Sequence, residues 1–173
     1  SKWLPLSAEV QDALEKDAEY LVFLDDDVLI PPQALHRMFY LMRHNPDWDL
    51  LTGIVTTKTI QPEPCIFRKD VSGAFWDWKF PDTFPIDACG MAFCMIRLST
   101  VKEKLQEPWF KWPKGMDEDT YREEGEDIYF CRRLREAGGT LMADGGVLCG
   151  HLTEDGKVVK LSEKRGQRIT AKG

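Results

Sequence analysis

The sequence has few of the features that mark a membrane, secreted or nucleic-acid-binding protein. Its five cysteines are odd in number and form no CxxC pair, which favours reduced thiols in a cytosolic protein. No apolar run approaches the roughly 20 residues that a membrane-spanning helix needs, and no signal peptide precedes Ser1. No basic run appears and the formal net charge is −6, which argues against nucleic-acid binding. These absences predict a soluble, cytoplasmic chain without a membrane span.

The composition is that of one globular domain. A chain of 173 residues is long enough to bury a sizeable core and short for two domains. Hydrophobic residues make up 43% of it, and six Trp and nine Phe supply bulky side chains for a core or a pocket. No internal repeat or low-complexity linker divides the sequence. We predict a single domain over residues 1–173, with a core over residues 1–152 and a polar tail over residues 153–173.

Hydrophobic periodicity predicts helices that alternate with strands. Helices are expected over residues 6–19, 33–44, 99–106 and 126–139. Strands are expected over residues 20–24, 49–57, 86–98 and 140–152, with an edge strand over residues 157–161. The first two strands are short apolar runs, as is typical of strands covered on both faces. This order indicates an α/β fold, a mostly parallel sheet flanked by helices.

Three consecutive carboxylates, Asp25, Asp26 and Asp27, follow directly on the apolar run YLVFL. Ionised side chains packed so closely repel one another, and partial burial strengthens the repulsion. Capping of the following helix needs one Asp, not three. In parallel α/β sheets, ligands bind beyond the carboxyl ends of the strands, where this cluster is expected. Hard oxygen ligands there favour Mg²⁺ or Mn²⁺, and these ions are commonly bound by carboxylates and by the phosphates of a substrate together.

Two further segments carry candidates for chemistry. Glu126 and Asp127 open the last predicted helix, where acids are common because of the helix dipole alone. The same dipole keeps them ionised, as a general base requires. His151 ends an apolar segment, and a lone His there is more often structural than a ligand. His151 becomes a candidate metal ligand only if the fold brings it beside Asp27, because imidazole and carboxylate together make an ordinary site for Mn²⁺.

Four tryptophans lie in irregular stretches with Pro and Gly rather than at core periodicity. They are Trp76, Trp78, Trp109 and Trp112. The simplest interpretation is that they anchor loops, and we expect this of at least two. The alternative is a platform on which the apolar face of a sugar ring stacks. Trp near acids is a frequent but unspecific composition of sugar sites.

Four segments, taken in order, resemble the family 2 type of GT-A glycosyltransferases. They are YLVFLDDDVLIPPQAL, DACGMAF, GEDIYFCRRLREAGG and CGHL, and the match runs from about Glu19 to Leu152. A DxD motif alone is weak, whereas four motifs in the family's order are specific. The resemblance implies a GT-A fold and metal-dependent, inverting transfer of a sugar to an acceptor hydroxyl. The donor would be a nucleoside diphosphate sugar, a UDP- or GDP-sugar.

The resemblance implies a metal site at the acidic cluster. Asp25 and Asp27 match the DxD pair that holds a divalent cation, Mn²⁺ or Mg²⁺, against the diphosphate of the donor. Asp26 lies between them in the same donor-binding segment. His151 matches the C-terminal histidine that completes the metal site in many members.

The resemblance also assigns catalysis and the binding of the donor sugar. Asp127 matches the second acid of the xED motif, usually the catalytic base, and Glu126 is the next choice. Ala88, Cys89 and Gly90 match the glycine-containing loop beside the donor sugar. The acceptor is not specified by the sequence, and an oligomer is possible.

The start of the chain and two alternatives complete the expectations. The family's opening βαβ unit precedes its DxD motif, whereas this chain starts one helix upstream of Asp25, so we expect an N-terminally truncated or minimal form of the fold. No QxxRW motif is present, unlike in processive polysaccharide synthases. One alternative is a non-catalytic module that binds the metal and the nucleotide-sugar. The other is a phosphatase of the haloacid dehalogenase type, whose first motif wants Thr or Val where this chain has Leu29.

Overall fold

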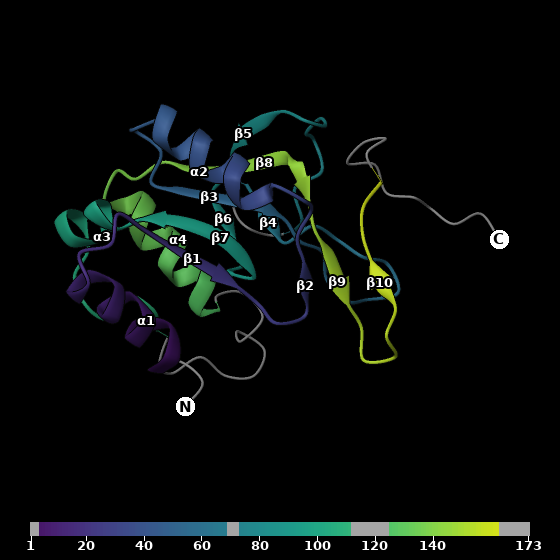
Figure 1. Ribbon diagram of the computed structural model, residues 1–173, viewed down its shortest axis with the longest axis horizontal. Helices are drawn as coiled ribbons and strands as arrows, with labels where there is room; N and C mark the ends of the chain where they lie inside the picture. Colours follow the sequence, from purple (N-terminus) through teal and green to yellow (C-terminus); the bar gives the residue numbers. More distant parts are fainter. Residues whose placement is uncertain (1–3, 69–72, 112–124, 163–173) are drawn as a thin grey trace.

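The computed structural model describes residues 4–68, 73–111 and 125–162, which form a mixed α/β structure (Figure 1). Its main sheet has five strands in the order β1-β7-β3-β8-β5. They are β1 (Tyr20–Leu24), β7 (Phe93–Arg97), β3 (Leu50–Ile54), β8 (Leu141–Leu148) and β5 (Thr83–Pro85). The pair β3–β8 is parallel, and the other three neighbouring pairs are antiparallel. The prediction of an α/β chain is confirmed in this coarse form.

The prediction of a mostly parallel sheet is wrong, and the cause lies in the segment over residues 86–98. This segment was expected as a strand interrupted by Gly90, and it divides there into β6 (Ala88–Cys89) and β7. β7 then inserts between β1 and β3 and runs antiparallel to both. An apolar run predicts burial on both faces, but it carries no information on the direction of the strand.

The strand directions nevertheless bring three chain segments to one edge. Since β7 is antiparallel to both β1 and β3, those two strands run the same way, and β8 runs parallel to β3. β1, β3 and β8 therefore end at the same edge of the sheet, where β7 begins; we call it the carboxyl edge. Two backbone hydrogen bonds of 2.9 Å tie the emerging segments together there, from Asp25 N–H to Ala92 O and from Cys149 N–H to Ile54 O.

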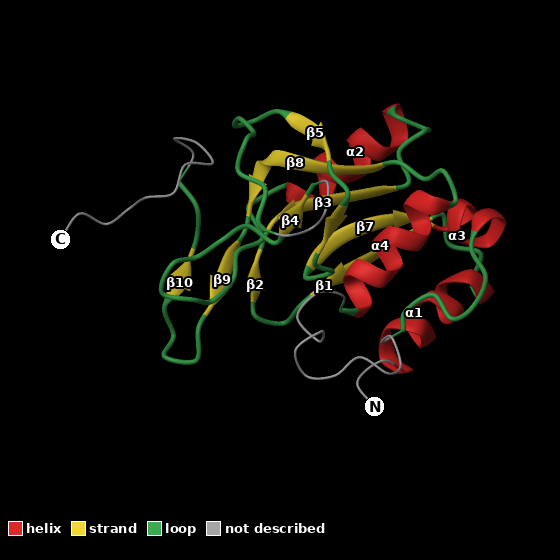
Figure 2. Cartoon of the chain, turned by 180° about the vertical axis from the view of Figure 1, so that it is seen from behind, coloured by secondary structure: helices red, strands yellow, loops and turns green. Residues whose placement is uncertain are grey.

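Helices cover both faces of the main sheet (Figure 2). One face carries α2 (Ala34–His44), and the other carries α1 (Leu4–Glu15), α3 (Leu98–Lys104) and α4 (Glu126–Glu136). Adjacent residues of β3 divide between the two cores: Leu50 packs with the three-helix side and Leu51 packs with α2. The predicted burial of this strand on both faces is confirmed. Within the described residues, no helix is long and apolar enough to cross a membrane.

Two small sheets extend from the carboxyl edge. One has the order β10-β9-β2, formed by β2 (Val28–Leu29), β9 (Gly150–Leu152) and β10 (Val158–Val159), and it projects beyond the main sheet (Figure 1). The other pairs β4 (Ile66–Phe67) with β6. The predicted edge strand is confirmed as β10, while the expected strand over residues 140–152 divides into β8 and β9. β2 is too short to be recognised in the sequence.

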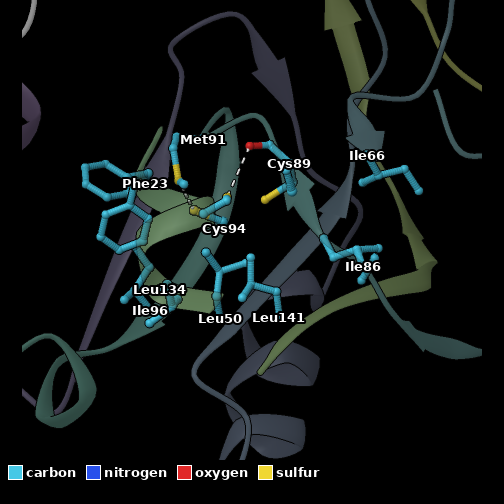
Figure 3. Close-up of a cluster of buried hydrophobic side chains, with 14 of the residues drawn as sticks. Phe23, Leu50, Ile66, Ile86, Cys89, Met91, Cys94, Ile96, Leu134 and Leu141 are labelled. Atoms are coloured by element: carbon cyan, nitrogen blue, oxygen red, sulfur yellow. Dashed lines mark hydrogen bonds between the residues drawn. The ribbon is translucent and has the colours of Figure 1, made fainter. Parts of the chain in front are cut away.

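The cysteines are free thiols, and most are buried, as predicted. Cys94 lies in the core beside Met91, and its Sγ donates to the Met91 Sδ at 3.2 Å (Figure 3). Burial raises the pKa of the Cys65 thiol to about 11 and that of Cys149 to about 12. Both thiols are therefore neutral at physiological pH, and they act as small apolar side chains rather than as nucleophiles.

Candidate functional site at the carboxyl edge

The three aspartates form the turn between β1 and β2. Val28 N–H donates to Asp25 O at 3.1 Å and closes the turn, while the backbone of Asp25 is held by Ala92 at the carboxyl edge. Asp25 and Asp26 are exposed, and Asp27 is half-buried. The residue that precedes α2 is Gln33, so none of the three aspartates caps this helix. Helix capping therefore does not explain the cluster.

Strand pairing places His151 against Asp27. β2 pairs with β9 so that Val28 lies opposite His151, and Leu152 N–H donates to Asp27 O at 2.8 Å. The imidazole Nε2 then lies 3.3 Å from the Asp27 Oδ1. Nδ1 lies 2.5 Å from Thr56 O, and because a carbonyl only accepts, the Nδ1 atom carries the proton. In the neutral ring, Nε2 therefore presents its lone pair on the side of Asp27.

Asp27 and His151 are spaced as two neighbouring ligands of one divalent cation would be. Ligands at adjacent corners of an octahedral site, each about 2.1 Å from the ion, lie about 3 Å apart. The distance of 3.3 Å between Nε2 and Oδ1 is close to this spacing. Asp25 does not complete a triad, because no three His, Cys, Asp or Glu side chains in the described part of the chain converge closely enough to hold a metal. The structure thus brings two of the three predicted ligands together and leaves Asp25 beside them.

The remaining oxygen of Asp27 contacts a residue that the sequence did not single out. Lys58 Nζ forms an ion pair with Asp27 Oδ2, and this hydrogen bond lowers the pKa of Asp27 below its ordinary value. Asp25 is exposed as a residue, but partial desolvation of its carboxyl group, followed by the charge of Asp27, raises the pKa of that group. Lys58 follows β3 by a few residues. Its only sequence signal is that position, which becomes informative once the ends of β1 and β3 are known to share an edge.

Asp127 lies in the first turn of α4, beside the segment that enters β7. Met91 N–H donates to Asp127 Oδ2 at 3.1 Å. The pKa of Asp127 is raised to about 6: burial is the main cause, the hydrogen bond from Met91 acts against it, and the charges of Glu126 and Asp25 add to it. Desolvation therefore has a larger effect on this pKa than the helix dipole, which would lower it. At neutral pH the carboxylate is still mostly ionised, and its pKa suits a general base.

The loop predicted to lie beside the donor sugar borders Asp127. Gly90 N–H donates to Cys65 O at 3.0 Å, and the next residue, Met91, binds Asp127. The side chains of Ala88 and Cys89 are buried, so this loop offers backbone groups rather than side chains to a ligand. A Cβ atom at Gly90 would lie 3.7 Å from Asp127 Oδ2, an ordinary contact distance. A small side chain at this position would therefore touch the carboxylate without a clash.

The tryptophans divide as the loop-anchoring interpretation expects. Trp78 and Trp109 are each 6% exposed and belong to the core on the three-helix side of the sheet. Trp78 stacks on Phe84, with ring centroids 5.7 Å apart. Trp76 is half-buried, and Trp112 lies outside the described residues. At Trp78 and Trp109 the indole is packed in the core rather than open for a sugar to stack on.

We expect Asp127 to make the folded protein less stable as the pH rises from about 4 to about 6. Below its ordinary value of 3.8, the carboxyl group is protonated in both the folded and the unfolded state. Between 3.8 and about 6 the unfolded chain releases the proton first, so unfolding is favoured, and the cost stays constant above that range. Asn keeps the acceptor for Met91 without the charge. Asp127→Asn should therefore stabilise the protein by on the order of 1–3 kcal/mol at pH 8 and by much less at pH 4, measured by urea unfolding. An equal effect at both pH values would contradict the shifted pKa.

Comparison with known proteins finds a structure of similar fold but no matching family. No family model matches the chain, and no curated protein matches it. Among solved structures, the whole chain aligns with 82% of the chain in the crystal structure of A197 from STIV, with a TM-score of 0.65 and 20% sequence identity. At this identity, the likeness shows a shared fold alone.

Proposed function

We propose that this chain is a metal-dependent glycosyltransferase of the GT-A type, which moves a sugar from a nucleoside diphosphate sugar to an acceptor hydroxyl with inversion. The observation that carries the proposal is the pairing of β2 with β9, which sets His151 Nε2 3.3 Å from Asp27 Oδ1. The resemblance to the glycosyltransferases implies that Asp27 and His151 lie close together, although they are far apart along the chain. The mixed sheet supplies it through the common direction of β1, β3 and β8.

In this proposal, the residues of the carboxyl edge divide the work. Asp27 and His151, with Asp25 beside them, would hold Mn²⁺ or Mg²⁺. A bound divalent ion would supply positive charge for the departing diphosphate. Asp127 accepts the proton of the acceptor hydroxyl at Oδ1, while the hydrogen bond from Met91 N–H fixes Oδ2. Gly90 has no side chain next to Asp127, so the donor sugar would approach this carboxylate along the backbone of the loop.

The test is a transfer assay on the full chain with UDP- and GDP-sugars, Mn²⁺ and a broad panel of hydroxyl acceptors. We expect release of the nucleoside diphosphate, formation of a glycosylated product by mass spectrometry, and loss of both on addition of EDTA. Product NMR should show the inverted anomeric configuration. Absence of turnover together with absence of UDP and GDP binding would contradict the proposal.

A second candidate is a non-catalytic module that binds the metal and the nucleotide-sugar. It needs only the pair of Asp27 and His151 and requires no general base. The same assay separates the two candidates. Binding of UDP or GDP in calorimetry, with neither transfer nor hydrolysis of any donor, would support the module.

A further inference from the structure

We propose that Lys58 is a mobile counter-ion that neutralises Asp27 in the metal-free protein and binds a phosphate oxygen of the donor diphosphate once a divalent cation is in place. This inference rests on the proposed function, since it concerns the same site, but it assigns a role to a residue outside every recognised motif. It predicts opposite effects of Lys58 on the binding of the metal and of the diphosphate.

The loop that carries Lys58 has an ordered base. Thr57 N–H donates to Glu63 O at 2.8 Å, and Glu63 N–H donates back to Thr57 Oγ1 at 3.0 Å. Thr59 Oγ1 donates to Gln61 O at 2.6 Å within the same loop. On the other side, Thr56 O accepts the hydrogen bond from His151. The backbone around Lys58 is therefore fixed to the site, and movement is left to its flexible side chain.

One carboxylate oxygen of Asp27 is already paired with a cationic side chain when no metal is bound. Lys58 contacts one carboxylate oxygen and His151 faces the other, so a cation that binds Asp27 must compete with the Lys58 ammonium group. The side chains of Lys58 and Asp27 are 36% and 32% exposed. Ion pairs of such exposure are weak, and a divalent cation can displace the ammonium group. Removal of the Lys58 charge should therefore strengthen metal binding.

The charges at the turn give the released ammonium group a second partner. Three carboxylates in consecutive positions outweigh one divalent cation, so an anionic diphosphate would meet a site with surplus negative charge. Lys58 is a cation whose field already reaches both Asp25 and Asp27. A lysine is a compact charge on a flexible stem and is an ordinary ligand of phosphate oxygens. Lys58 is thus placed to leave Asp27 for the diphosphate without any movement of the backbone.

The experiment measures Mn²⁺ and nucleoside diphosphate binding separately on the full chain. Electron paramagnetic resonance of free Mn²⁺ gives the metal affinity without nucleotide, and calorimetry with UDP and GDP at saturating Mn²⁺ gives the diphosphate affinity. For Lys58→Met we expect Mn²⁺ to bind about 3- to 10-fold more tightly and the better of the two diphosphates to bind about 10-fold more weakly. Lys58→Arg, which keeps the charge, should retain most of the diphosphate affinity.

Lys157→Met is the matched control. Lys157 also forms an ion pair with an aspartate, Asp155 at 2.6 Å, but in the turn between β9 and β10. Lys157→Met should change neither the Mn²⁺ affinity nor the diphosphate affinity. Thermal melting should show that Lys58→Met and Lys157→Met both fold. If Lys58→Met and Lys157→Met change the affinities for Mn²⁺ and for the diphosphate in the same way, the net charge of the protein rather than the position of Lys58 is responsible, and the inference is overturned.

Asp27→Asn separates failure of this inference from failure of the proposed function. If Asp27→Asn weakens Mn²⁺ binding but Lys58→Met leaves it unchanged or weaker, the metal site stands and the counter-ion role is overturned. Unchanged diphosphate affinity in Lys58→Met would overturn the phosphate role. If Mn²⁺ binds to Asp27→Asn as it binds to the wild type, the metal site itself is wrong, and the proposed function fails with the inference.

Discussion

Replacement of Asp127 by Asn is expected to lower the rate of sugar transfer by about 10²–10⁴-fold, the usual contribution of a general base. The amide cannot take a proton from the acceptor hydroxyl, but it can still accept the hydrogen bond from Met91 N–H, which is 3.1 Å long in the structure. The loop that borders the site should therefore stay in place. Binding of UDP or GDP, measured by calorimetry with Mn²⁺, should stay nearly unchanged, and the loss should fall mainly on kcat.

The pH profile gives this prediction a second readout. Because the pKa of Asp127 is raised to about 6, transfer by the wild type should increase with pH up to about 6 to 7 and then level off. The residual transfer activity of Asp127→Asn should not show this rise with pH. Glu136→Gln serves as the control, since Glu136 lies at the far end of α4 and pairs with Arg132 on the surface. Wild-type transfer by Asp127→Asn would show that the base is another residue, and Glu126 would be tested next.

The sequence predicted where the strands lie better than how they pair. Apolar runs at residues 20–24 and 49–57 correctly located β1 and β3, because burial on both faces leaves a clear signature. The direction of β7 was missed, since it depends on the loop at Gly90 and on which neighbours accept the strand. The proximity of Asp27 and His151 does not depend on the direction of β7. With β7 antiparallel to both of its neighbours, β1 and β3 still end at the same edge, as they would in a parallel sheet.

Burial and tertiary contacts explain what the sequence could not reveal about the site. Lys58 reaches Asp27 only because the ends of β1 and β3 share an edge, and no local pattern marks it. Asp127 was expected to be ionised by the helix dipole, but its burial, which a single sequence does not show, has the larger effect on its pKa. Trp78 and Trp109 lack core periodicity yet fill the core, because they come from irregular segments that fold over the sheet.

Replacement of Asp27 by Asn is expected to weaken Mn²⁺ binding by at least about 10- to 100-fold, and nucleoside diphosphate binding with it. A neutral amide is a poorer ligand for a hard cation than a carboxylate is, and this loss outweighs the release of the competing Lys58 ammonium group. The fold should tolerate the change, because the hydrogen bond that joins the turn to β9 is accepted by the backbone oxygen of Asp27. The two aspartates thus have separable roles: Asp27→Asn should weaken the binding of Mn²⁺ and of the nucleoside diphosphate, whereas Asp127→Asn should leave both nearly unchanged.

Asp155→Asn provides the matched control for the Asp27 prediction. Asp155 is also paired with a lysine, at 2.6 Å, but it lies in the turn between β9 and β10, away from His151. Electron paramagnetic resonance of free Mn²⁺ should report wild-type affinity for this variant. His151→Ala should weaken Mn²⁺ binding as Asp27→Asn does, because Nε2 is held in position by the contact between Nδ1 and Thr56 O. If both site variants instead bind Mn²⁺ as the wild type does, the cation lies elsewhere, and the 3.3 Å contact between His151 and Asp27 serves only to join β2 to β9.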